Sequence, residues 1–411
     1  MAVGTYLAAR IVGTWELYLL AFALLAIPLV AWVLMLASRD SVTVTRTLHP
    51  AQPTAGSHLS LFVHLRNGSF LPGPQIAVGD AAGDLDPSPE TVESESLAPH
   101  GRRTLEVPLR PARRGVHRLP PLRVETHDPL GLVRSVREEG EEQTIVVYPR
   151  LAVLDSCLLL AEVGDHERVK SVGLPSSGGL EFRGIRPYNP GEPLNRVDWK
   201  ATARSGSLML RETDDPANGD VTIVLDGAAA AVAGELPETS FELAVEAAAA
   251  IGAYLLLQGR TVVLIRHQSA PETARVTPGA GSRETLLERL AEARADARMP
   301  VEATLASPRG GPAPDRPGTL VLVTSALNAG LARALTGLAR RGLVVSVLYV
   351  DPASFRAGSS GSARSDGRPG EAGGVQLMLV QAGVRCLTVA RGDDLRESLS
   401  RHRRPAKVAA S

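Results

Sequence analysis

The densest group of side chains able to do chemistry lies between Glu181 and Arg211. Carboxylates, a tyrosine and a lysine follow one another there at short intervals, and each of these groups can accept or donate a proton in catalysis. A hydrolase of the paired-carboxylate type needs only two such acids at a suitable separation. Glu181 and Asp198 are the pair that such a mechanism would use.

Cations are almost as frequent as anions in the same stretch, and aromatic rings accompany them. Arginine binds a carboxylate through two hydrogen bonds and also lies flat over a ring, so this composition is typical of a partly buried network of ion pairs and stacked rings. Around Phe182 and Trp199 we therefore expect structural bracing or partner recognition and no catalytic residue, with the hydrolase as the alternative. The cations are Arg183, Arg186, Arg196, Lys200, Arg204 and Arg211.

Asp226 is the second candidate, because it ends the apolar run 221–225. In an open α/β sheet, ligands bind beyond the carboxyl ends of the strands. A divalent cation needs about six oxygen ligands, whereas the second and fourth residues after Asp226 are alanines and a later strand end offers only Thr324 and Ser325. We expect no metal and no cofactor, and we interpret Asp226 as a loop or helix-capping residue.

Composition and missing motifs exclude several classes of function. The chain has no Gly-x-x-x-x-Gly-Lys phosphate loop, no His-Glu-x-x-His and no Gly-x-Ser-x-Gly elbow. Lysine plus arginine and aspartate plus glutamate both number 44, so no net positive field attracts nucleic acid, and we expect no such partner. Cys157 and Cys386 form no paired motif, which is typical of reduced thiols.

The elements that position Asp226 extend over residues 216–400. Short apolar strands alternate there with amphipathic helices, which predicts an α/β domain with a doubly wound parallel sheet covered on both faces. The range 352–374 is rich in Gly, Ser and Arg and is expected to be a disordered loop. Residues 401–411 form a basic tail. The expected strands are 221–226, 261–266, 320–324, 344–350 and 384–389, and the expected helices are 241–257, 282–297, 331–341 and one from 393.

Residues 41–150 show a different pattern, with polar and apolar residues alternating over short runs. This period of two, with Asn67-Gly68 as the clearest turn, predicts a small antiparallel β-sandwich. The polar, proline-rich stretch 80–99 is expected to be a surface loop. The expected strands are 41–45, 59–66, 104–109, 122–126 and 143–148.

Residues 1–40 contain an apolar run without any charged residue from Leu17 to Ala37. At about 1.5 Å per residue this run matches a hydrocarbon core of about 30 Å, and it is longer than the apolar region of a cleaved signal peptide. We expect a membrane anchor with a single transmembrane helix over residues 15–37, in contact with lipid. We also expect the inner (cytoplasmic) membrane, with the other domains on the cytoplasmic side.

The signature segment, residues 151–215, resembles the bacterial family called domain of unknown function 58. The domain after it resembles the von Willebrand factor A fold, whose metal site carries serines where this chain has Ala228 and Ala230. Within the segment, the chain departs from the family pattern at Glu192 and Asn195. The residues that carry the resemblance are Glu181, Phe182, Arg186, Tyr188, Pro190, Gly191, Arg196, Asp198, Trp199, Lys200 and Arg204.

This resemblance implies a membrane protein associated with MoxR-type AAA+ ATPases, acting as an adaptor or in assembly of envelope or other complexes. We therefore expect a non-enzymatic adaptor that binds a partner protein through the signature residues. Two alternatives remain: an envelope-associated hydrolase that uses the signature carboxylates, and a metal-dependent protein-binding domain at Asp226.

Overall fold

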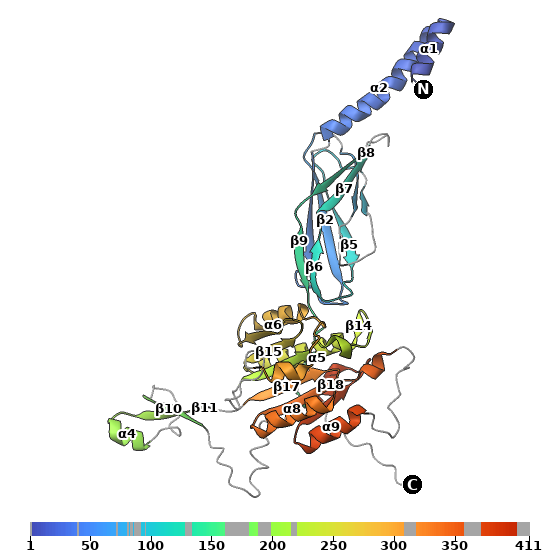
Figure 1. Ribbon diagram of the computed structural model, residues 1–411. Helices are drawn as coiled ribbons and strands as arrows, with labels where there is room; N and C mark the ends of the chain where they lie inside the picture. Colours follow the sequence, from blue (N-terminus) through green and yellow to red (C-terminus); the bar gives the residue numbers. More distant parts are fainter. Residues whose placement is uncertain are drawn as a thin grey trace, which may run out of the picture. The chain divides into compact units, whose positions relative to one another are not determined.

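The computed structural model divides into two compact units, Met1–Tyr148 and Pro149–Ser411 (Figure 1). For residues 31, 34–38, 92, 181–187, 210–214 and 371 it describes the backbone alone. Each unit is therefore presented by itself. The described residues are 2–38, 41–70, 73–79, 82, 85, 92–94, 96–127, 134–160, 181–187, 199–214, 220–307, 318–356 and 371–400.

The first unit begins with two helices, α1 (Ala2–Val12) and α2 (Trp15–Ser38). Gly13 joins them with a φ of 75°, a left-handed conformation that suits glycine. α1 packs against α2, with the rings of Tyr6 and Tyr18 in edge-to-face contact at 5.7 Å. The second helix covers the whole apolar run.

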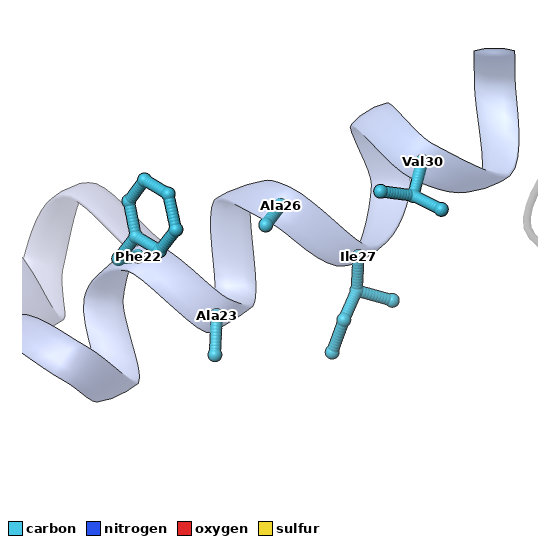
Figure 2. A pocket seen from close by; sticks show the side chains of 5 residues that line it. All are labelled: Phe22, Ala23, Ala26, Ile27 and Val30. Carbon is cyan, nitrogen blue, oxygen red and sulfur yellow. The ribbon is translucent and has the colours of Figure 1, made fainter.

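α2 presents large apolar side chains that no other described element covers. Phe22 is 71% exposed and Val30 is 54% exposed. Figure 2 shows these two side chains with Ala23, Ala26 and Ile27 around a shallow groove on the helix. Apolar side chains in such numbers are unusual on a surface that faces water.

Antiparallel sheets follow these helices. In β1 and β2 every second side chain is buried, apart from the partly buried Leu48, because alternate residues of a strand point to opposite faces. Side chains from the three- and four-stranded sheets, and from a further strand pair, enclose one apolar core. The sheets are β1 (Val42–His49), β2 (Leu59–Asn67) and β5 (Arg102–Leu109); β4 (Val92–Ser94), β3 (Gln75–Gly79), β7 (Leu122–His127) and β8 (Arg134–Glu139); and the pair β6 (Gly115–Leu119) and β9 (Gln143–Val147).

The range 80–99 is not entirely the surface loop that its composition predicts. β4 lies within it and pairs with β3. Leu85 and Leu97 are buried in the common core. These apolar residues are widely spaced among polar ones, so the alternation that marks a strand is too short to recognise.

A buried arginine joins strands of the first unit. Arg46 is 8% exposed, and its guanidinium donates to the carbonyl oxygens of Leu119 and Pro120 at 2.8 and 2.7 Å and to the Gln143 Oε1 at 3.0 Å. Burial lowers the pKa of Arg46. The guanidinium therefore ties β1 to the β6–β7 corner and to β9 through its hydrogen bonds.

The second unit contains a six-stranded sheet with the order β16-β15-β12-β17-β18-β19. The expected fully parallel sheet is wrong at one edge, because β16 runs antiparallel to β15. Only a short turn, 268–271, joins these two strands, so they form a hairpin and the sheet is mixed. The strands are β12 (Val221–Asp226), β15 (Val262–His267), β16 (Glu272–Val276), β17 (Thr319–Thr324), β18 (Val344–Val350) and β19 (Arg385–Val389).

Helices cover both faces of this sheet (Figure 1). α5 and α6 pack on the face of Ile223, while α7, α8 and α9 share a core with Val224. The alternation of side chains along β12 therefore supplies both cores. The helices are α5 (Ser240–Leu257), α6 (Ser282–Ala291), α7 (Val301–Leu305), α8 (Ala329–Arg340), α9 (Glu371–Gln381) and α10 (Leu395–Ser400).

α5 is long and apolar enough to cross a membrane, and within the described residues the same test selects no second helix of that length. Most of α5 is buried against the sheet, so its apolarity is that of a core helix. The Thr239 hydroxyl accepts a hydrogen bond from the Glu242 N–H at 3.2 Å and caps its first turn. The shorter apolar stretches are Ala2–Val12 and Trp15–Val30.

The expected disorder over 352–374 is wrong at both ends of that range. Pro352–Phe355 forms a 3₁₀ turn (η5) that the Asp351 carboxylate caps, and the Phe355 side chain is buried. α9 begins at Glu371. Residues 357–370, and the basic tail 401–411, lie outside the described residues.

Residues 151–160 attach to the end of the second unit. The Leu158 N–H donates to the Leu399 carbonyl at 2.8 Å, and Ser156 and Ser400 exchange hydrogen bonds of 3.1 Å. The Arg396 guanidinium pairs with Asp155 at 2.7 Å. We call residues 155–160 and α10 together the clasp. It places the beginning of the predicted signature segment on the α/β unit.

Candidate functional site

The signature residues lie on a two-stranded hairpin with a short helix. β10 (Glu181–Pro187) pairs antiparallel with β11 (Met209–Asp214), and α4 (Trp199–Ser205) precedes β11 (Figure 1). The described register places Glu181 opposite Asp214. Glu181, Phe182 and Arg186 belong to β10, described as backbone. Tyr188, Pro190, Gly191, Arg196 and Asp198 lie outside the described residues.

α4 carries the remaining signature side chains, and all of them are exposed. Trp199 is 69% exposed, Lys200 and Arg204 are also exposed, and α4 has no buried residue. The Thr202 hydroxyl accepts from the Met209 N–H at 3.0 Å and fixes the helix to β11. The expected partly buried network is therefore wrong at Trp199, because a two-turn helix on a hairpin offers little surface to cover an indole. Partner recognition fits this exposure.

A second candidate site lies beyond the carboxyl ends of β12 and β17. We call it the carboxyl-end pocket. It has a volume of about 290 Å³ and contains two carboxylates among mostly apolar side chains. Its lining residues are Asp226, Ala228, Ala230, Ala231, Ala297, Arg298, Met299, Pro300, Val301, Glu302, Ala326, Asn328 and Leu331.

Asp226 ends β12 and is 6% exposed. Its Oδ1 accepts from the Ala228 N–H at 3.0 Å, and its Oδ2 lies 2.7 Å from the Thr324 hydroxyl. Burial raises the pKa of Asp226 and the Glu302 carboxylate adds to this, while the hydrogen bonds from Thr324 and Ala228 oppose it. Asp226 is thus a buried, bonded carboxyl group and caps no helix.

The Thr324 hydroxyl has two possible acceptors within hydrogen-bond distance but only one proton to donate. It accepts from the Ala326 N–H at 2.9 Å and also lies 3.0 Å from the Ala326 carbonyl and 2.7 Å from Asp226 Oδ2. A hydroxyl donates one hydrogen bond and accepts two. A protonated Asp226 would donate to Thr324, whose own proton would then serve the Ala326 carbonyl. The raised pKa of Asp226 agrees with this arrangement.

His267 lies next to Asp226 on the neighbouring strand, since the two residues are paired in register at the ends of β15 and β12. Its Nε2 lies 2.9 Å from the Met299 carbonyl, and its Nδ1 lies 2.7 Å from the Thr304 hydroxyl. The Nε2 is 3.9 Å from Asp226 Oδ1. Both ring nitrogens are bonded elsewhere, so His267 positions the 299–304 segment beside Asp226.

Gly227 allows two backbone segments to approach the end of β12. Its N–H donates to the His267 carbonyl at 2.8 Å, and its carbonyl accepts from the Ala297 N–H at 2.9 Å. An added Cβ would lie 2.4 Å from the His267 carbonyl oxygen and 2.5 Å from that of Arg294. The loop after Asp226 is therefore fixed by backbone hydrogen bonds that only a glycine permits.

Glu302, in α7, contributes the second carboxylate. Its Oε2 is buried and has no hydrogen-bond partner among the described residues. The Asn328 side chain beside it accepts from the Leu331 N–H at 2.8 Å and caps α8. Within the described part of the chain, Glu302 Oε2 is thus a buried acceptor of this pocket to which no protein group donates a hydrogen bond.

The donor set does not fit a divalent cation. Both Asp226 oxygens are already hydrogen-bonded within the protein, and Ala228 and Ala230 offer no side-chain oxygen. Among the residues that the structure describes, no three His, Cys, Asp or Glu side chains gather closely enough to hold a metal ion. A hard cation needs about six oxygens. This pocket provides too few.

Sequence reasoning identified Asp226 and Thr324 but missed His267, Glu302 and Gly227. A signal for His267 was present, because the last residues of neighbouring parallel strands lie at one edge of a sheet. Gly227 follows directly after Asp226, where a close backbone approach is common. Glu302 follows an irregular loop, and its spacing carries no such signal.

The geometry defines a class of protein: antiparallel sheets followed by a doubly wound sheet with a pocket at its carboxyl end. Residues 184–373 match the family model described as "Protein of unknown function DUF58". The match covers less than half of the chain, from β10 to the beginning of α9. It is also 24% identical over 332 residues to "Uncharacterized protein YeaD" of Bacillus subtilis (strain 168), across 77% of this chain and 78% of that protein.

A solved structure is similar over a smaller part. The von Willebrand factor type A protein from Catenulispora acidiphila matches with a TM-score of 0.28 and 13% identity. The match covers 46% of this chain and 42% of that one, so this chain spans less than half of its length. The fold given above rests on strand order and pairing.

Proposed function

We propose that the protein is a membrane-anchored adaptor that binds a partner protein and does not itself catalyse a reaction. The observation that carries this proposal is the exposed Trp199 on α4, accompanied by the exposed cations Lys200 and Arg204. Tryptophan and arginine are enriched among the residues that dominate protein–protein affinity. α4 has no buried residue, so covering the large exposed Trp199 ring with a partner protein would contribute favourably to the binding free energy.

The exposed apolar side chains of α2 support the membrane anchor. The helix has 24 residues, and at about 1.5 Å per residue it is long enough for a hydrocarbon core of about 30 Å. Lipid would cover Phe22, Ile27 and Val30 (Figure 2). In this proposal the helix crosses the inner membrane once, and the other domains lie in the cytoplasm.

The partner that we propose is an AAA+ ATPase of the MoxR type, as the resemblance of the signature segment implies. The family description names no partner and no activity. An ATPase needs a fixed point on which to act, and an adaptor with a membrane helix would provide it.

The test is recovery of the ATPase with the full-length protein from crosslinked native membranes. Replacing Trp199→Ala together with Arg204→Glu should weaken partner affinity by at least about 2 kcal/mol, roughly thirtyfold. Leu236→Ala, which removes another exposed apolar side chain, is the matched control and should leave recovery unchanged. Thermal unfolding of all variants verifies that the fold is retained.

Unchanged recovery of the ATPase with the Trp199 and Arg204 double variant would reject the signature face as the binding surface. Turnover of a peptide or an envelope polymer by the purified protein, abolished in Glu181→Gln, would establish the hydrolase in place of the adaptor.

A further inference from the structure

One surface of the second unit combines exposed apolar side chains with exposed arginines, and it lies on α8 and α9. These two helices pack side by side on the same face of the six-stranded sheet (Figure 1). Each connects one parallel strand to the next, so both run in the same direction. Their outward sides therefore belong to one surface, which we call the helical face.

α9 contributes the apolar part of the helical face. Val375 and Leu379 are buried in the core beneath it, whereas Leu377 is 61%, Met378 59% and Val380 55% exposed. At about 100° per residue, Leu377 and Val380 point away from the buried pair. A helix that is apolar on all sides is normally buried on all sides, in a protein core or in a membrane. The outward side of α9 is thus suited to a second apolar environment.

α8 contributes the cationic part of the helical face. Leu331 and Leu335 are buried against the sheet, and Arg333 and Arg340 point away from them. Arg341 follows at the end of the helix, and all three arginines are exposed. None of them forms an ion pair with a carboxylate among the residues that the structure describes. Their charges are therefore available to a partner.

Carboxylates are scarce on this face. α8 contains no acidic residue, and the acidic residue of α9 is Glu371, at its first position. α7 packs beside α8 and contributes Glu302, whose Oε2 is buried. Although the whole chain has no net charge, the exposed side chains described on the helical face are cationic or apolar. Such a surface complements an anionic partner that also has an apolar interior.

An anionic bilayer has both properties. Basic residues attract its headgroups, and each one near the surface strengthens binding about fivefold. Apolar side chains beside them enter the boundary between headgroups and acyl chains. A second copy of the chain fits less well, because a two-fold interface would bring two sets of arginines together.

We propose that the helical face docks on an anionic phospholipid bilayer. Arg333, Arg340 and Arg341 contact the headgroups, and Leu377 and Val380 enter the interface. This contact belongs to the α/β unit and goes beyond the adaptor function. It requires neither partner binding through Trp199 nor a membrane-spanning α2.

The experiment uses the full chain in neutral phosphatidylcholine nanodiscs, mixed with liposomes and separated by flotation. Liposomes with equal parts of phosphatidylcholine and phosphatidylglycerol should bind about a hundredfold more tightly than phosphatidylcholine liposomes, which measure any association through α2. Arg333→Gln with Arg340→Gln should weaken binding to the anionic liposomes about twenty-fivefold. Leu377→Ser with Val380→Ser should weaken it at least about tenfold.

Matched controls change the same residue types elsewhere. Arg283→Gln with Arg294→Gln removes two exposed arginines in and after α6, which packs on the opposite face of the sheet. Leu257→Ser removes a side chain at the end of α5 that is 76% exposed. Both controls should bind anionic liposomes as the native protein does. Thermal unfolding verifies that each variant is folded.

A fluorescent label shows which surface meets the lipid. Nitrobenzoxadiazole attached at Leu377→Cys, in a chain with Cys386→Ala, should shift to shorter wavelength when anionic liposomes are added and should be quenched by spin-labelled lipid. The same label at Leu257→Cys should not change. A label at position 377 that is already shifted without liposomes would show that another part of the protein covers the face, and would overturn the proposal.

Equal binding to neutral and anionic liposomes, or binding that both double variants retain, would also overturn the proposal. A dimer in sedimentation experiments that Leu377→Ser with Val380→Ser abolishes would assign the face to a second copy instead. These assays contain no ATPase, so their outcome is independent of partner recovery in the crosslinking experiment.

Discussion

Gly227 shows how a single residue type can fix a site. Its constraint is one of space, because an added methyl group would overlap two carbonyl oxygens of the neighbouring segments. Gly227→Ala should destabilise the second unit by about 3 kcal/mol, the upper range for overpacking a rigid core. Chemical unfolding monitored on that unit measures the loss.

Gly337 provides the matched control for this substitution. It lies inside α8 with no atom within 4 Å of an added Cβ. Gly337→Ala should be neutral or stabilise by about 0.5–1 kcal/mol, because alanine loses less backbone entropy in a helix. Equal destabilisation by the two alanines would refute the steric explanation.

Asp226 should make the stability of the second unit depend on pH. Burial raises its pKa above the ordinary 3.8, so between the unfolded and the folded pKa the folded state binds a proton that the unfolded state has released. Its contribution to stability is therefore complete below the unfolded pKa and is lost as pH rises through the folded pKa. Thermal unfolding from acid to alkaline pH measures this slope.

The variant Asp226→Asn isolates that group from its titratable neighbours, His267 and Glu302. An asparagine can still accept from the Ala228 N–H and can donate to Thr324, and it does not ionise. The stability of this variant should change less with pH than that of the native protein. A slope that is identical in both proteins would assign the titration to another group.

Only some of the residues that form the candidate pocket could be predicted from the sequence. Asp226 could be identified because it ends an unmistakable apolar strand, and Thr324 ends another. Glu302 could not, because its position depends on how the irregular segment after α6 folds back over the strand ends. The exposure of Trp199 was equally hidden, since a sequence does not show how little surrounds a short helix.

α2 is the element whose apolar surface most constrains the environment of the chain. Ala23 and Ala26 lie in the middle of its exposed face (Figure 2). Replacing both by arginine would cost about 5–7 kcal/mol at the centre of a bilayer. The double variant should move from the carbonate-resistant membrane fraction to the soluble or aggregated fraction.

A matched control keeps the added charge away from the middle of α2. Arginines at Val3 and Val12, on the exposed surface of α1, add the same charge near the helix ends and should leave the protein in the membrane fraction. Membrane retention of the Ala23 and Ala26 double variant would contradict the proposal that α2 spans the bilayer.

Some strands of this protein can be predicted from sequence patterns, and others cannot. β12, β17 and β18 are continuous apolar runs because helices cover both sides of them, and such runs are plain in a sequence. β4 has three residues and β16 lies at an edge with most of its side chains exposed. The pairing of β4 depends on β3, which is distant in sequence, and the pairing of β16 depends on its short hairpin with β15. The local composition of β4 and β16 therefore does not predict these strands.

At the scale of the whole molecule, the order of the parts was predictable, but the attachment of residues 155–160 to α10 within the second unit was not. The change from alternating short runs to apolar strands with helices marks two kinds of unit. Residues 155–160 look like a linker, yet they are bonded to α10, more than two hundred residues away. Contacts between residues so far apart in the chain cannot be predicted from the local sequence of either segment. The alignment with YeaD covers 332 residues and so extends beyond the DUF58 region.

The clasp would have a mechanical consequence in the membrane-anchored protein that we propose. Because the chain enters the second unit beside the helix that ends it, tension arriving through Pro149 meets the bonds from Asp155, Ser156 and Leu158 to α10 before it reaches any strand of the sheet. Pulling would first strain this short junction, and the carboxyl-end pocket would keep its shape until the junction gave way. In the proposed anchored protein, the bonds to α10 would therefore bear load before the bond from the Ser346 hydroxyl of β18 to the Leu159 carbonyl, at 2.8 Å, which leads into the sheet.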